Sequence, residues 1–333
     1  MIRRIMLSVV VVLTTILSGV AAEPVLDYDF TGIFPASVKT VGLVMPASVF
    51  CRTKYDRAVD ALKTAGYKVK PAPRLDFSKL ASPQDRAADL MDVWTDSEVD
   101  LVLCIRGGAG AEKILPYIDW ERLRKRPDQV FMGFSDITIL HNALLKHRVG
   151  RPISGPMISS IPRMTAVSRT WMARAIAREP QPTLQLHALK PGAFSGLTCG
   201  GHAHRFSVVH RLGESVETKG RVVLLESEVS ISLRMLRETL DYLVDSGAMT
   251  GVAGVIFGDM TPGSGSPNRD AREMKGKALA KARAEVEALK RRFADRVACP
   301  VYDGFDYGHG PINYAVDHLR RVTVDASGVM RWE

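Results

Sequence analysis

Three short segments far apart in the chain each hold a residue type that hydrolytic chemistry needs. They are GFSDIT (133–138), LLESE (224–228) and YGHGPIN (307–313). A serine hydroxyl becomes an effective nucleophile only when a base accepts its proton, and the base needs a third group to hold its tautomer. We therefore predict Ser135 as the nucleophile, His309 as the base and Glu226 as the acid that orients it.

Ser135 is predicted to lie on a turn between a strand and a helix. Residues 130–134 form a short apolar run typical of a buried strand, and residues 136–145 have a helical pattern. At such a turn the next backbone N–H, that of Asp136, points at a developing oxyanion. The turn differs from the G-x-S-x-G nucleophile elbow because Ile137 replaces the second glycine. A serine that merely caps the helix is the alternative.

A glycine-rich turn, RGGAG, directly follows the apolar strand predicted at residues 101–105. Glycines at such a turn let a ligand approach the backbone, and their N–H groups can bind an anion. The sequence meets neither the G-x-G-x-x-G nor the G-x-x-x-x-G-K-[ST] nucleotide pattern. We predict that Gly107 or Gly108 gives Ser135 a second oxyanion donor. Arg106 is predicted to pair with a substrate carboxylate, with a surface ion pair as the alternative.

The ordered set of motifs resembles the LD-carboxypeptidase family of serine peptidases, which includes the microcin-immunity peptidases. The resemblance spans residues 38–325 and also includes the segments GLVMPAS and GVIFG. It implies that Ser135 is the nucleophile, that Glu226 ends the strand carrying the acid, and that His309 is the base.

The same resemblance implies further details of the site. The oxyanion hole maps to the N–H groups of Gly108 and Asp136. The family motif Gly-Gly-Asn is GGHAH here, which leaves the substrate-binding role of Gly201 open. Strand alternation puts Glu226 and Glu228 on one face, so Glu228 stays an alternative acid.

The reaction implied by the resemblance needs no cofactor. It is hydrolysis of the amide between an L-centre residue and a C-terminal D-amino acid, and the expected partner is a peptidoglycan-derived peptide that loses its terminal D-Ala. Two alternatives stay open: a peptidase for toxic or acylated peptides, and an exported protein that binds muropeptides without cutting them. We expect no metal site, because the sequence has no C-x-x-C and no carboxylate cluster completes the pair His202 and His204, which we assign to substrate contact or the surface.

Alternating strands and helices in the first half predict an α/β fold with an open, mostly parallel sheet. We expect a second, strand-rich α+β domain that carries the acid and the histidine. The predicted boundaries are 1–22 for a signal peptide, 23–177 for the nucleophile domain, 178–195 for a linker and 196–333 for the second domain.

Ligands of open α/β sheets bind outside the carboxyl ends of the strands. Ser48, Gly108 and Ser135 all follow predicted strands, so we expect them to meet at that edge. Glu226 and His309 must reach the same place from the second domain. The site is therefore expected in a cleft between the domains.

The N-terminal segment has the pattern of a secretory signal peptide. Arg3 and Arg4 precede an apolar run at residues 5–20, and Ala21 and Ala22 follow it. We expect an exported, periplasmic protein without stable membrane association after signal cleavage; an uncleaved anchor is the alternative. The 46% hydrophobic and 24% charged residues among 333 are ordinary for a globular protein.

Residues 269–296 are the most charged stretch and also carry apolar residues at helical spacing. The pattern predicts an amphipathic helix with a solvated basic face. It lacks the interleaved aromatic residues of a nucleic-acid groove, so we expect no nucleic-acid partner. The oligomeric state stays open, a homodimer being one alternative. Four widely spaced cysteines do not form a disulfide framework, although one bridge stays open.

Overall fold

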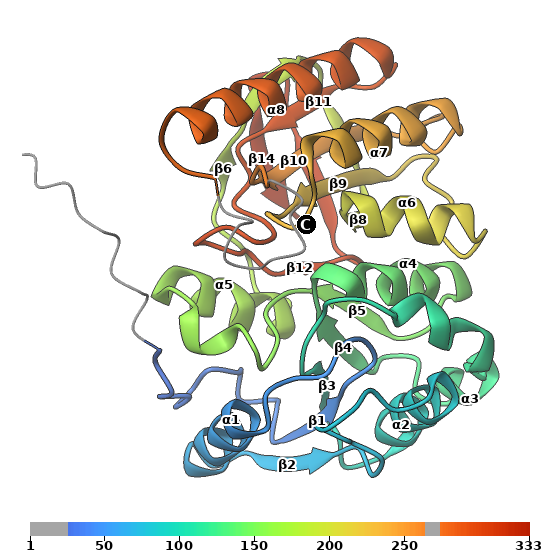
Figure 1. The fold of residues 1–333 in the computed structure, drawn as a ribbon, viewed down its shortest axis with the longest axis vertical. Coiled ribbons are helices and arrows are strands. Elements are labelled where there is room, and N and C mark those ends of the chain that lie inside the picture. Colours follow the sequence, from blue (N-terminus) through green and yellow to red (C-terminus); the bar gives the residue numbers. More distant parts are fainter. Residues whose placement is uncertain (1–25, 264–273) are drawn as a thin grey trace, which may run out of the picture.

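The computed structural model describes residues 26–263 and 274–333. They form two sheet-containing halves, one above the other in Figure 1, with β12 and the helices α4 and α5 near the junction. The predicted signal peptide lies outside the described residues, as does the start of the basic stretch. None of the helices in the described ranges has both the length and the apolar character that a membrane span requires.

The lower half is built on a six-stranded sheet with the strand order β12-β5-β4-β3-β1-β2. Five strands are parallel, and only β12 runs antiparallel, beside β5. The strands are β1 (Thr40–Val44), β2 (Lys68–Pro71), β3 (Leu101–Cys104), β4 (Val130–Gly133), β5 (Arg151–Ser154) and β12 (Val316–Asp317). The open parallel sheet predicted for the first domain is confirmed.

Helices connect these strands, as parallel pairing requires. The α-helices are α1 (Arg52–Thr64), α2 (Pro83–Thr95), α3 (Trp120–Arg124), α4 (Thr138–His147) and α5 (Ala166–Ala177). Three short 3₁₀-helices accompany them: η1 (Ala111–Tyr117), η2 (Ser135–Ile137) and η3 (Ile161–Arg163). The helix expected at residues 136–145 is therefore a 3₁₀ turn that continues into α4.

The upper half is built on an eight-stranded sheet with the order β6-β14-β13-β8-β9-β10-β11-β7. The strands are β6 (Leu184–Gln185), β7 (His187–Lys190), β8 (Phe194–His202), β9 (Val222–Ser227), β10 (Gly254–Met260), β11 (Val301–Asp303), β13 (Arg321–Val324) and β14 (Val329–Trp332). Its four central strands, β8 to β11, are parallel, and the outer pairings are antiparallel. The helices are α6 (Ala203–Arg211), α7 (Leu233–Asp245) and α8 (Gly276–Arg296).

The segment predicted as a linker, residues 178–195, is not one throughout. It contributes β6 and β7 to opposite edges of the second sheet and begins β8. Both edge strands are short and partly exposed, so they lack the apolar alternation that reveals a buried strand. The chain also returns to the first sheet through β12, where Asp317 accepts a hydrogen bond from Arg151 Nε at 2.7 Å.

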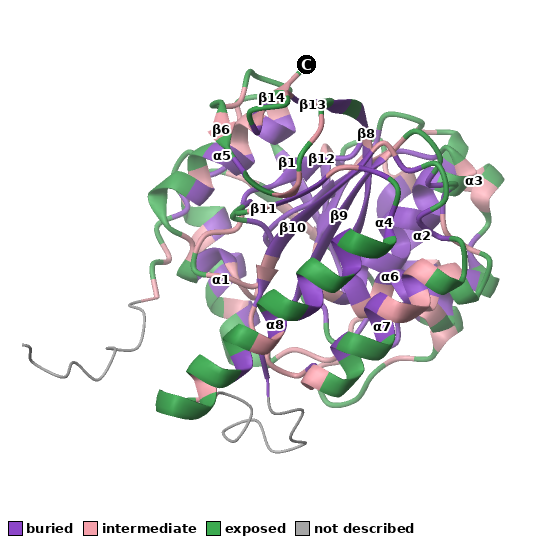
Figure 2. Cartoon of the chain, turned by 90° about the horizontal axis from the view of Figure 1, so that it is seen from above, coloured by how far each residue is buried: buried purple, intermediate pink, exposed green. Residues whose placement is uncertain are grey.

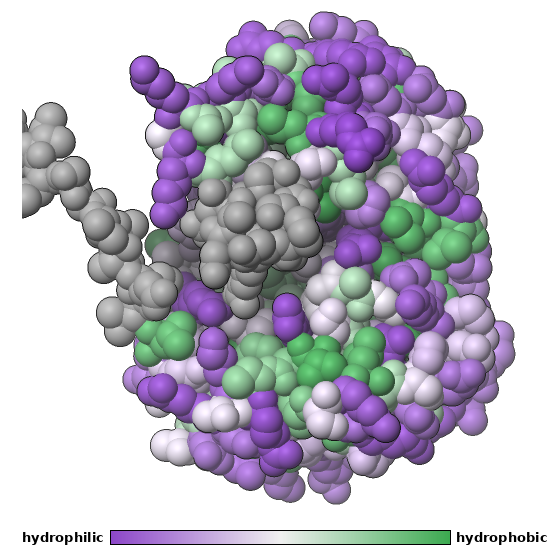
Figure 3. Space-filling model, in the orientation of Figure 1, coloured by the Kyte–Doolittle hydropathy of each residue, from purple (hydrophilic) through white to green (hydrophobic). Residues whose placement is uncertain are grey.

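The central strands of both sheets are almost completely buried, whereas the outer faces of helices such as α8 are exposed (Figure 2). The face seen in Figure 3 is largely hydrophilic with scattered apolar patches. All four cysteines are free thiols in the structure.

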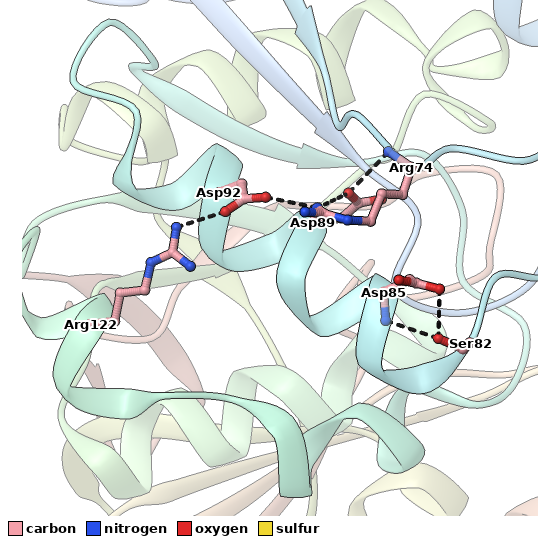
Figure 4. A network of polar contacts seen from close by, with 6 residues as sticks. All are labelled: Arg74, Ser82, Asp85, Asp89, Asp92 and Arg122. Atoms are coloured by element: carbon pink, nitrogen blue, oxygen red, sulfur yellow. Dashed lines mark hydrogen bonds and ion pairs between the residues drawn. The ribbon is translucent and has the colours of Figure 1, made fainter.

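Helix α2 is held by polar contacts at its start and along its side (Figure 4). Ser82 caps it, since its Oγ accepts the N–H of Asp85 at 3.1 Å. Arg74 contacts Asp89 and Asp92, and Arg122 contacts Asp92 from α3. The fixed helix then supports two loops at the carboxyl edge of the sheet.

That support comes from Arg86, a buried side chain of α2. Its Nη1 donates to the carbonyl oxygen of Gly110 at 3.0 Å and also to the carbonyl oxygen of Pro46. The loops after β1 and β3 are therefore tied to the same helix.

Candidate active site

Ser135 occupies a sharp turn between β4 and α4. Its φ is +65°, in the left-handed region that side chains other than glycine rarely adopt. In the described chain the other non-glycine residues with positive φ, Arg148 and Arg178, simply end helices. Such strain costs about 1–3 kcal/mol and concentrates at functional sites. The caps of η2 and α4 use no side chain, so the structure does not support the helix-cap alternative for Ser135.

His309 and Glu226 are in direct contact. Nδ1 of His309 lies 2.7 Å from Oε2 of Glu226, which is the next-to-last residue of β9 and is 1% exposed. Gly308 makes the approach feasible: its φ is +110°, and a Cβ there would lie 2.6 Å from Oε2 of Glu226. The imidazole can donate its Nδ1 proton to the carboxylate, leaving Nε2 as an acceptor.

The loop that carries His309 is braced at several points. The N–H of Gly308 donates to Oδ1 of Asn313 at 3.1 Å, and the N–H of Asp259 donates to the carbonyl of Tyr307 at 2.8 Å. The hydroxyl of Tyr307 donates to Oγ of Ser154 at 2.9 Å, on the first sheet. The loop is thus attached to both halves of the molecule.

Further contacts bring the imidazole beside the serine turn. The ring of Phe134, the residue before Ser135, lies 4.8 Å from the ring of His309 between centroids. Thr138 Oγ1, at the start of α4, accepts the N–H of His202 at 3.0 Å, from the end of β8. The segments carrying serine, carboxylate and histidine therefore converge at the junction of the two halves.

The contact between the two titratable groups shifts both of their pKa values. Burial lowers the pKa of His309, but the charge and the hydrogen bond of Glu226 outweigh it, and the pKa of His309 lies above its ordinary value. Burial raises the pKa of Glu226, against the opposing effect of His309. The carboxylate therefore makes the imidazole a stronger base than it would be in the same buried place alone.

The glycine-rich turn after β3 lies against Ser135. A Cβ on Gly107 would come within 2.9 Å of the Cβ of Ser135. Gly108 has φ +110°, and a Cβ there would lie 2.3 Å from Oγ of Ser48. That same Oγ accepts the N–H of Ala109 at 3.0 Å. Ser48 thus shapes the turn, which leaves no room for side chains at either glycine.

The remaining predicted site residues, Arg106, Gly201 and Glu228, each have a contact of their own. Arg106 donates to the carbonyl oxygen of Val49 at 2.8 Å, on the loop after β1. Gly201 packs on Thr138, whose Oγ1 would lie 2.5 Å from a Cβ at that glycine. Glu228 lies beyond the end of β9 and accepts the N–H of Ser230 at 3.0 Å. Of the two candidate acids, only Glu226 has a hydrogen bond to the imidazole among the described residues.

A pocket of about 380 Å³ opens beside the imidazole. Its lining combines His309 with apolar side chains and two charged ones, Glu228 and Arg283. The pocket therefore offers apolar contacts together with one acidic and one basic side chain.

His202, for which we predicted substrate contact or a surface position, does not lie on the surface. It is 2% exposed, its ring lies edge-on to that of His309 at 5.7 Å, and burial lowers its pKa well below the ordinary value. The neighbouring His204 is on α6, so the two rings do not share a strand face. Among the described residues, no three His, Cys, Asp or Glu side chains are grouped to hold a metal ion.

The sequence matches two parts of one protein family. Residues 41–153 match the LD-carboxypeptidase N-terminal domain, and residues 195–324 match the LD-carboxypeptidase C-terminal domain. A Bacillus subtilis protein named probable murein peptide carboxypeptidase is 30% identical over 230 residues, covering 66% of this chain and 72% of that protein.

Solved structures of similar fold agree. The muramoyltetrapeptide carboxypeptidase of Oxalobacter formigenes superposes with a TM-score of 0.72 at 20% identity, covering 88% of this chain and 97% of that one. The microcin C7 self-immunity protein MccF of Escherichia coli also has a TM-score of 0.72, at 17% identity over 93% of this chain and 99% of that one. The matched domains, the relative and the shared fold lead to one assignment: the chain belongs to the LD-carboxypeptidase family of serine peptidases.

Proposed function

We propose that this protein is a serine carboxypeptidase that releases the terminal D-Ala from peptidoglycan stem tetrapeptides by cleaving an L,D-amide bond. The contact between His309 Nδ1 and Glu226 Oε2 beside the strained Ser135 is the observation that carries the proposal. The names of the murein peptide and muramoyltetrapeptide carboxypeptidases support this substrate class.

Acylation begins when Oγ of Ser135 attacks the scissile carbonyl carbon. Nε2 of His309 accepts the hydroxyl proton, and Glu226 stabilises the resulting imidazolium through Nδ1. The tetrahedral intermediate collapses as the imidazolium protonates the leaving amine, so the C–N bond breaks and D-Ala departs. Water, deprotonated by the same imidazole, then hydrolyses the ester, returning the proton to Ser135.

The oxyanion of each tetrahedral intermediate needs hydrogen-bond donors fixed before the reaction. The N–H groups of Gly108 and Asp136 are the proposed donors, because the glycine turn lies against Ser135 and Asp136 follows it in the elbow. Loss of one such donor typically costs about 3–4 kcal/mol of transition-state stabilisation. The fixed backbone of two separate turns would thus supply much of the rate enhancement.

A peptide ending in a carboxylate needs a cation for recognition. Arg106 and Arg283 are the candidates: Arg106 follows β3 beside Gly107, and Arg283 lines the pocket that contains His309. A guanidinium can bind a carboxylate with two parallel hydrogen bonds, which a longer peptide without a terminus at that position would lose.

The second candidate activity is hydrolysis of a toxic or acylated peptide. It is favoured by the similarity to MccF, which covers 93% of this chain at the level of fold. The same serine chemistry would serve both activities, and only the leaving group and its binding pocket would differ. We also propose export to the periplasm, on the sequence pattern of the first 22 residues.

The decisive experiment is incubation of the purified protein with separated muropeptides and mass analysis of the products. Loss of one D-Ala from tetrapeptide, and not from tripeptide, is the expected result, with Ser135→Ala inactive. A structure of MccF contains glutamyl sulfamoyl guanosine. Unchanged tetrapeptide together with cleavage of that compound would favour the second activity. A serine-reactive phosphonate should label the wild type covalently but not Ser135→Ala. Labelling that survives in Ser135→Ala would contradict both candidate activities.

A further inference from the structure

Arg205, in the first turn of α6, reaches across to both turns that carry the proposed oxyanion donors. Its Nε lies 2.9 Å from Oδ1 of Asp136, and its Nη2 donates to the carbonyl oxygen of Gly108 at 2.9 Å. The other carboxylate oxygen, Oδ2 of Asp136, accepts the N–H of Ala111 at 2.9 Å. One guanidinium therefore connects the turn of Ser135 with the glycine-rich turn.

The contact differs from an exposed ion pair, which contributes little to rigidity. The side chain of Asp136 is completely buried and that of Arg205 is 23% exposed. Removing the cation from a buried carboxylate is strongly destabilising, because the remaining charge is left without compensation. Arginine also presents its donors in a rigid plane, so binding one acceptor orients the other donors.

We propose that Arg205 is a positioning residue for the oxyanion hole. By holding the Asp136 side chain and the Gly108 carbonyl at once, it sets the distance between the N–H groups of these two residues. It acts through Gly108 and Asp136 and is not itself a catalytic residue. The inference rests on the proposed function for the identity of the reaction, whereas the coupling of the two turns stands on the contacts themselves.

The distance between the two turns matters because they belong to separate loops. Oxyanion donors act at about 2.7–3.1 Å from the developing charge, and a misplacement of about 1 Å can lower the rate about a hundredfold. Arg205 belongs to the upper half of the molecule, while Gly108 and Asp136 belong to the lower half (Figure 1). The second domain would thus complete the oxyanion hole as well as supply the acid and the base.

Other charged groups also face Asp136, and they do not replace Arg205. Burial raises the pKa of Asp136, and Glu112 of η1 adds to that effect, whereas Arg205, the N–H of Ala111 and Arg86 oppose it. Arg86 donates to the carbonyl of Gly110 from α2. Among the described residues, Arg205 is the cation that makes an ion pair with the carboxylate.

Hydrogen exchange of the full-length protein tests the coupling without any substrate. In Arg205→Met, peptides covering residues 105–111 and 133–138 should exchange faster than in the wild type. Arg211→Met is the matched control, because Arg211 lies on the same helix but stacks on Tyr242, 3.7 Å from the ring centroid. Unchanged exchange in both segments of a folded Arg205→Met protein would overturn the proposal.

The catalytic consequence is measured as the rate of covalent labelling by a fluorophosphonate, which needs the nucleophile but not the natural substrate. We expect a 10- to 100-fold slower reaction in Arg205→Met, an intermediate rate in Arg205→Lys, and the wild-type rate in Arg211→Met. With muropeptide as the substrate, kcat should fall while KM changes little. A higher KM alone, with kcat and the labelling rate unchanged, would contradict a positioning role.

A double variant separates positioning from simple destabilisation. Asp136→Asn removes the buried charge, so Arg205→Met with Asp136→Asn should recover much of the thermal stability that Arg205→Met alone loses. The labelling rate should stay low, because nothing then holds the Gly108 carbonyl. Recovery of both stability and rate would reduce the role of Arg205 to charge compensation. Failure of the proposed function would give different results. Labelling would persist in Ser135→Ala, or the wild type would release no D-Ala although Arg205→Met still showed the faster hydrogen exchange.

Discussion

The imidazole of His309 and the carboxylate of Glu226 meet at 2.7 Å although they are 83 positions apart in the chain. The contact lies near the end of a buried parallel strand, and a Cβ at position 308, where the chain has glycine, would lie 2.6 Å from Oε2 of Glu226. Because an orienting acid must hold one tautomer of the base, the proposed activation of the serine depends on this pair.

Removal of the charge on Glu226 should change both the rate and its pH dependence. In the wild type the raised pKa of His309 should place the acid limb of kcat/KM above pH 6.5, since the neutral imidazole is the active form. In Glu226→Gln burial dominates, so the limb should move to lower pH while the maximal rate falls about 10²- to 10⁴-fold. Measurement of kcat/KM from about pH 5 to about pH 9, a range that includes the ordinary pKa of histidine, checks this.

Glu228→Gln is the matched control for that experiment, because Glu228 lines the same pocket but binds Ser230 rather than the imidazole. Its acid limb should stay close to that of the wild type. A larger shift in Glu228→Gln than in Glu226→Gln would reverse the assignment of the acid.

Two substitutions at Ser135 should separate the effect of losing the nucleophile from the effect of relieving the backbone strain of the turn. Both Ser135→Ala and Ser135→Gly remove Oγ, and both should abolish phosphonate labelling. Only glycine adopts φ +65° without steric cost, so Ser135→Gly should be more stable than Ser135→Ala by about 1 kcal/mol. Chemical denaturation of the two variants measures the difference, and equal stabilities would show that the turn relaxes.

Gly308→Ala should damage the site more than a positive φ alone explains. The new Cβ would meet Glu226, and we expect a loss of about 1–3 kcal/mol in the free energy of unfolding and at least a tenfold loss in kcat. Gly213→Ala is the control, because Gly213 has φ +70° but nothing within 4 Å of the added Cβ. Equal effects of the two substitutions on kcat would exclude the contact as the cause.

Tyr307→Phe should weaken the bracing of the histidine loop against the first sheet. The change removes the donor to the buried Oγ of Ser154, and we expect a loss of about 1–2 kcal/mol in the free energy of unfolding. Tyr117→Phe, at a residue that is 44% exposed, should change the stability by less than about 0.5 kcal/mol. Thermal and denaturant unfolding of both variants provide the comparison; an unaffected Tyr307→Phe would mean that the loop is held by its other bonds.

Features that depend on neighbours in the sequence were predictable. The strand and the helical turn around Ser135 follow from short apolar runs, and the glycine turn after β3 follows from an apolar strand with RGGAG directly after it. The alternation of strands and helices likewise predicts the parallel sheet, because each crossover needs a helix of its own.

Other features depended on contacts that no local pattern encodes. The edge strands β6 and β7 are too short and too exposed for apolar alternation, so the segment 178–195 was predicted as a linker. His202 was open to surface placement, and it is buried because the end of β8 packs on α4.

The sequence alone determined which residue types are available and which local turns present them, because hydrophobic period and glycine placement act over a few residues. Tertiary structure alone decided which of Glu226 and Glu228 meets His309, since strand alternation puts both on one face and the end of β9 at Ser227 separates them. It also decided that Arg205 reaches Asp136, a contact made only when the two halves dock. The physical reason is common to both: a hydrogen bond or a close ion pair needs atoms within about 3 Å, and only the packed fold sets distances between remote segments.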